Sequence, residues 1–70
     1  MVILTKHVKV RMKERGIRIS DVKMIIMQPE HQEDVFENKV LVAGKVSGKV
    51  LEIVYSKKGN NFIVITAYWL

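Results

Sequence analysis

The sequence predicts an α+β domain in which two N-terminal helices pack on a four-stranded antiparallel sheet. Before the single proline, Pro29, apolar residues recur at helical spacing, and after it they alternate as in strands. Glycines and asparagines in the second half fall at intervals suited to turns. Helices followed by strands with short connections are typical of a segregated α+β fold with an antiparallel meander.

The first helix is expected from about Lys6 to Arg15. Thr5 is suited to be its N-cap, and Gly16 stands just beyond its end. Val8 and Met12 are one turn apart, so we expect both to face the core.

The second helix is expected at about 20–28, with Ser20 as its N-cap. Val22, Ile25 and Ile26 form its apolar stripe, and Pro29 disfavours further helix. Both helices are too short to be stable alone in water, so each needs the sheet.

The four strands are expected at about 33–37, 40–46, 49–55 and 62–70. Turns are predicted at Asn38 with Lys39 and at Ser47 with Gly48, and a longer loop at 56–61.

Alternation in the third strand predicts that Leu51, Ile53 and Tyr55 share one face. Val50, Glu52 and Val54 then share the other. The last strand is apolar on both faces, which is typical of a central or doubly covered strand.

Length and composition bound the class of protein. Seventy residues, 49% of them hydrophobic, are expected to form one domain over 1–70. There is no cysteine for disulfides, and the net charge of +5 favours anionic partners such as nucleic acid. No apolar run approaches the roughly 20 residues of a membrane span, and no signal-peptide pattern is present, so we expect a cytoplasmic protein.

Common catalytic and cofactor motifs are absent from the sequence. It has no glycine-rich phosphate loop, no His-Glu-x-x-His and no nucleophile elbow, so neither a cofactor nor a metal site is expected. His31, beside Glu30 and Glu33, is interpreted as an exposed loop histidine rather than a metal ligand.

The most distinctive feature is a row formed by His7, Arg11 and Arg15 at i, i+4 and i+8 on one flank of the first helix. One interpretation is a phosphate-binding ridge, because arginine clamps phosphate bidentately and histidine passes protons near neutral pH. The other is structural: the arginines pair with carboxylates of the sheet, and Arg15, which projects closest to Val8 and Met12, is the more structural of the two. The candidates for such pairing are Glu33, Asp34, Glu37 and Glu52.

Tyrosines and lysines of the strands are weaker signals. Tyr55 and Tyr68 are expected on the last two strands as cross-strand neighbours. Each either stacks on a base or donates a proton, or else is a half-buried aromatic with its hydroxyl in water. Lysines beside the turns either extend the positive potential or protect edges and solubility. These lysines are Lys45, Lys49, Lys57 and Lys58.

The N-terminal pattern H-x-x-x-R-M-x-E-R-G-I, from His7 to Ile17, resembles the opening of a family of short bacterial and archaeal proteins known only as a domain of unknown function, number 4258. The run 20–22 and the strand segments 51–55 and 65–69 extend the likeness over nearly the whole chain. It is weak from 31 to 49.

The resemblance implies a compact α+β unit, similar in outline to ribonuclease toxins of the RelE, ParE and BrnT-like type. Such toxins pair with an antitoxin and cleave RNA with arginines, lysines, a tyrosine or a histidine. The family pattern implies His7, Arg11, Arg15 and Tyr68 as catalytic candidates, although the RelE catalytic set does not map onto this chain. Arg11, Arg15 and Lys45 are the candidates for contacts with nucleic acid.

Two hypotheses for function follow. The first is a toxin-like RNA-binding protein that acts as a metal-independent endoribonuclease in a toxin–antitoxin pair. The alternative is a non-enzymatic interaction module, a homodimer or one half of a two-protein complex. It rests on the last strand, which is apolar on both faces and ends in Tyr68, Trp69 and Leu70.

Overall fold

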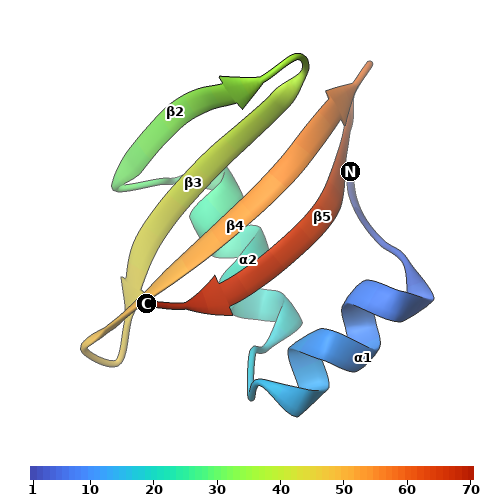
Figure 1. The fold of residues 1–70 in the computed structure, drawn as a ribbon. Coiled ribbons are helices and arrows are strands. Elements are labelled where there is room, and N and C mark those ends of the chain that lie inside the picture. Colours follow the sequence, from blue (N-terminus) through green and yellow to red (C-terminus); the bar gives the residue numbers. More distant parts are fainter.

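The chain folds into one sheet with both helices on the same side of it (Figure 1), as seen in a computed structural model that describes residues 1–70. The elements follow one another as β1 (Val2–Leu4), α1 (Lys6–Glu14), α2 (Ile19–Met27), β2 (His31–Phe36), β3 (Lys39–Val46), β4 (Lys49–Lys58) and β5 (Asn61–Trp69). Neither helix is long and apolar enough to cross a membrane.

The sheet differs from the expected four antiparallel strands. It has five strands in the order β1-β5-β4-β3-β2, and β1 runs parallel to β5, with Val2 opposite Phe62 and Leu4 opposite Val64. The α+β class is correct, but the prediction of four antiparallel strands is wrong. The prediction missed β1, which is only three residues long. A run that short shows no alternation, and its parallel pairing joins the two ends of the chain without any local signal.

Helix α1 forms as its sequence predicts. Thr5 is confirmed as N-cap, since its Oγ1 accepts a hydrogen bond from the Val8 N–H at 3.2 Å. Val8 and Met12 are buried against the sheet. The helix ends before Gly16, whose φ of 67° lies in the left-handed region that glycine adopts without strain.

Helix α2 begins one residue earlier than expected. Its N-cap is Arg18, which makes no capping hydrogen bond through its side chain, so the prediction of Ser20 as N-cap is wrong. Instead the Arg18 Nε donates to the Asp21 Oδ2 at 3.0 Å. Asp21 lies in the first turn of α2, at the positive end of the helix dipole, where a carboxylate is favoured.

Two tight turns connect β3 to β4 and β4 to β5. Ser47 and Gly48 both have positive φ, 51° and 82°, as a two-residue hairpin turn of type I′ requires, so the predicted turn is confirmed. β4 continues to Lys58, which shortens the expected 56–61 loop to a tight turn at Gly59 and Asn60.

The core lies between the helices and one face of the sheet. Leu51, Ile53 and Tyr55 are all buried there, as the alternation of β4 predicts. The members of this core from the helices and sheet are Val8, Met12, Ile17, Val22, Ile25, Ile26, Val42, Leu51, Ile53, Tyr55, Val64 and Ala67.

A β-bulge separates the two tyrosines. The register slips between Val54, which faces Thr66, and Tyr55, which faces Val64, so that Ile65 has no partner in β4. Tyr68 lies opposite Glu52, on the face away from the helices. The expectation that Tyr55 and Tyr68 are cross-strand neighbours is therefore wrong.

Candidate functional site

Helix α1 runs beside the outer edge of β5 (Figure 1). Side chains of these two elements line a groove between them. β1 pairs only with Phe62–Val64, so from Ile65 onward this edge of β5 has no strand beside it. The flank of α1 takes the place of the missing strand. The groove encloses about 210 Å³ and is lined by His7, Val8, Arg11 and Arg15 of α1 and by Ile65, Thr66 and Ala67 of β5.

Arg15 is tied to the strand. Its Nη1 donates to the carbonyl oxygen of Ala67 at 2.9 Å, so it is the more structural arginine, as its place beside the core predicts. In an antiparallel ladder the C=O and N–H of one residue point to the same side. The N–H of Ala67 therefore also faces away from β4 and toward the groove.

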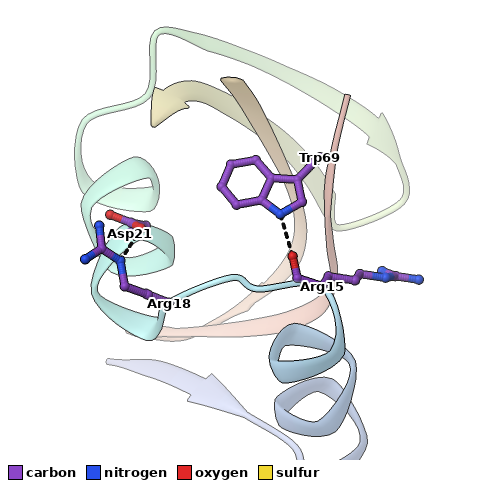
Figure 2. Close-up of polar contacts among 4 residues, drawn as sticks. All are labelled: Arg15, Arg18, Asp21 and Trp69. Atoms are coloured by element: carbon purple, nitrogen blue, oxygen red, sulfur yellow. Dashed lines mark hydrogen bonds and ion pairs between the residues drawn. The ribbon is translucent and has the colours of Figure 1, made fainter. Parts of the chain in front are cut away.

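Trp69 fixes the end of α1 that forms the groove wall. Its Nε1 donates to the backbone carbonyl of Arg15 at 2.7 Å, while the Arg15 side chain extends away from the indole (Figure 2). Arg15 is thus held through its carbonyl by Trp69 and through its guanidinium by Ala67. Both contacts lock the spacing between α1 and β5.

His7 and Arg11 are the two members of the row whose side chains have no partner within the protein. Both are exposed, and neither side chain makes a hydrogen bond or an ion pair. Helical periodicity places them one turn apart on the same flank as Arg15. Their donors remain available to a ligand in the groove.

The expected pairing of the arginines with carboxylates of the sheet does not occur. The only ion pairs are those of Arg18 with Asp21 and of His31 with Glu33. Glu52 instead accepts a hydrogen bond from Tyr68 at 2.6 Å. No carboxylate lines the groove, so its only charged or titratable side chains are those of His7, Arg11 and Arg15.

Tyr68 and Lys45 lie elsewhere. The side chain of Tyr68 is on the uncovered face of the sheet, bonded to Glu52. Lys45 stands on β3, two strands from β5, where its backbone N–H donates to the Glu30 Oε2 at 2.9 Å. The groove thus brings together three of the five residues proposed from the sequence and leaves these two outside it.

Sequence reasoning did not identify the contribution of β5. The free edge at Ile65, Thr66 and Ala67 depends on where β1 stops, and the role of Trp69 depends on how α1 docks. The only available signal was the lone tryptophan near the end of a strand, because a buried indole N–H usually finds an acceptor. No three His, Asp or Glu side chains are grouped as a metal site.

The tyrosines make the stability of the fold sensitive to alkaline pH. The hydrogen bond to Glu52, together with burial and the nearby negative charge, raises the pKa of Tyr68. Burial, and secondarily the charge of Asp34, raises the pKa of Tyr55. A raised pKa means that the folded state holds its proton more tightly than the unfolded state does.

We therefore expect stability to fall as pH rises above about 10, the ordinary tyrosine value. Tyr68→Phe should make this fall shallower, because one of the two linked protons is removed. Thermal melts across that pH range measure the effect. An unchanged slope in the variant would contradict the linkage assigned to Tyr68.

The sequence of the chain matches a known family. Residues 4–69 match the family model described as Domain of unknown function (DUF4258), and the chain belongs to this family. No curated protein and no solved structure matches the chain.

Proposed function

We propose that this member of the family is a toxin-like RNA-binding protein that holds an RNA phosphate in the α1–β5 groove and cleaves RNA without a metal ion. The observation that carries the proposal is the convergence of His7, Arg11 and Arg15 on one groove with no carboxylate in its lining. A cationic groove without internal acids is suited to an anionic ligand, because no buried ion pair must be broken to admit it.

Arg11 is the principal phosphate ligand in this proposal. Its guanidinium is exposed and unpaired, and its planar donors match the oxygens of a phosphate. The Ala67 N–H on the opposite wall supplies a backbone donor, and Arg15 adds positive charge from a fixed position. Further lysines on α1 raise the local potential without lining the groove. These are Lys6, Lys9 and Lys13.

The chemistry assigned to the site is transesterification within the RNA chain. His7 takes the proton of a 2′-hydroxyl, whose oxygen forms a bond to the adjacent phosphorus. The bond from phosphorus to the 5′-oxygen breaks, and that oxygen takes a proton from water. Arg11 stabilises the charge that develops on the equatorial phosphate oxygens. The products are a 2′,3′-cyclic phosphate and a 5′-hydroxyl.

The resemblance in outline to RelE, ParE and BrnT-like toxins, which the sequence suggests, is part of the same proposal. Those proteins cleave RNA with arginines and a histidine or tyrosine rather than with a fixed triad. In this chain the H-x-x-x-R-M-x-E-R-G-I run supplies His7, Arg11 and Arg15. Under the proposal, a second, antitoxin-like protein covers the groove and restrains the activity.

The test is incubation of the purified protein with single-stranded RNA, structured RNA and ribosome-bound RNA, each with and without a chelator. We expect cleavage products with 2′,3′-cyclic phosphate ends, in amounts unchanged by the chelator. If all three RNAs stay intact, with and without divalent ions, the nuclease proposal is wrong. If RNA is cleaved without the chelator but not with it, the proposal that cleavage needs no metal ion is wrong.

The uncovered face of the sheet supports a second candidate function, that of a homodimeric interaction module. Both helices lie on the other side (Figure 1), and the apolar residues of this face stay outside the core. Those that are only partly buried are Ile3, Leu41, Val50, Val54 and Ile63, and Ala43 is buried among them.

Sedimentation equilibrium of the full chain tests this candidate. A dimer that dissociates in the variant Val54→Lys supports it, because the lysine places a charge at the middle of the apolar face. A strict monomer at high concentration excludes it.

A further inference from the structure

The outer edge of the sheet at β2 is the longest strand edge that nothing covers. β2 ends the strand order β1-β5-β4-β3-β2, and all six of its residues are exposed. Its apolar residues share this exposure, with Val35 at 53% and Phe36 at 64%. At the opposite end of the sheet, β1 has only three residues, and the edge of β5 beyond it is flanked by α1.

An edge strand presents backbone N–H and C=O groups that can pair with another chain. Proteins commonly protect such edges with lysine, proline or a covering segment. β2 contains neither lysine nor proline, and its only protection is its acidic side chains, which repel like-charged strands, and the bulge between Asp34 and Phe36. Its edge is therefore open to the addition of a strand, a common mode of peptide recognition.

The charge along β2 restricts which strand can be added. Four of the seven acidic residues lie in or beside β2, and no lysine or arginine lies between positions 28 and 38. The four are Glu30, Glu33, Asp34 and Glu37. Asp34 and Glu37 make no ion pair or side-chain hydrogen bond, and Glu33 has only the weak contact with His31 at 3.8 Å.

Like charges directly opposite each other destabilise a strand pair, so two copies of β2 repel one another. A segment that alternates lysine or arginine with apolar residues is favoured instead, because it places its cations on the face of Asp34 and its apolar residues on the opposite face, where Phe36 lies. We propose that the β2 edge docks an extended, basic segment of a partner protein, which pairs with β2 as a further strand of the sheet.

The test uses the full chain and synthetic peptides of alternating valine and lysine, with a matched peptide of valine and glutamate. Backbone amide NMR locates the site. We expect the basic peptide to bind and to shift amides of β2 and β3, and the acidic peptide not to bind. Replacing alternate peptide residues with proline should abolish binding, because proline removes backbone donors.

The double variant E33K/D34K should bind the basic peptide at least about tenfold more weakly and should gain affinity for the acidic peptide. E14K, on α1 and outside β2, reverses one acidic residue away from the edge and is the control; it should change neither affinity. Both sites are exposed, so thermal melts should confirm that the variants fold. Absence of binding, shifts confined to the groove or the uncovered face, equal binding of both peptides, or self-association through β2 would each overturn the proposal.

Discussion

We expect His7→Gln to lower the rate of RNA cleavage by about 100- to 10,000-fold, the usual contribution of a general acid or base. His7 is the only imidazole in the groove, and its ring has no protein partner that competes for its nitrogens. Glutamine keeps a polar side chain but does not exchange protons near neutral pH. Because His7 is exposed on α1, stability should change little.

Single-turnover cleavage and equilibrium RNA binding, measured on the same preparation, separate chemistry from affinity. The matched control is His31→Gln on β2, which removes the other histidine of the chain from a place outside the groove. The proposed role requires that His7→Gln lose rate and retain affinity while His31→Gln behaves as the unmodified protein. Equal rates in both variants would remove His7 from the mechanism.

The second large effect concerns stability. Trp69→Ala should lower the free energy of unfolding by about 3 kcal/mol, the lower end of the range for deleting a large buried aromatic, since Trp69 is half-buried. The change removes packing against the core and the hydrogen bond from Nε1 to the Arg15 carbonyl. In a domain of this size, this loss corresponds to a fall in melting temperature of roughly 12–24 °C.

Trp69→Phe serves as the control for that measurement, because it keeps an aromatic ring and deletes the N–H donor. We expect a loss of about 1 kcal/mol, the typical net value of one hydrogen bond. Urea denaturation followed by circular dichroism measures both variants. If Trp69→Ala costs less than Trp69→Phe, or neither change is measurable, the indole does not hold α1 against β5.

Local features of the fold could be predicted from the sequence. The Thr5 cap, the burial of Val8 and Met12, and the Ser47–Gly48 turn each depend on residues close together in the chain. The strand β1 could not be predicted in this way. Its three residues carry no period, and its parallel partner lies about sixty positions away, so only the packed sheet defines it.

At the candidate site too, local features could be predicted from the sequence and long-range ones could not. Helical periodicity alone placed His7, Arg11 and Arg15 on one flank, and the structure brings all three to one groove. Which strand they face is not a local property. The bulge at Ile65 and the alternation of β5 decide that Tyr68 points to the other face. The sheet acids did not reach the arginines because most of them gather at β2, the opposite edge of the sheet.

The central claim is that Arg11 contacts an RNA phosphate in the groove, and salt dependence tests it most directly. Lys13→Gln is the matched control. It removes the same charge from the same helix, at a position about 200° around the helix axis from Arg11. Affinity for single-stranded RNA is measured over a range of salt concentrations for Arg11→Gln and Lys13→Gln. We predict that Arg11→Gln lowers the slope of log affinity against log salt by about 0.7, the value for one lost contact, and that Lys13→Gln leaves it nearly unchanged. Equal slopes in the two variants and the unmodified protein would contradict the claim.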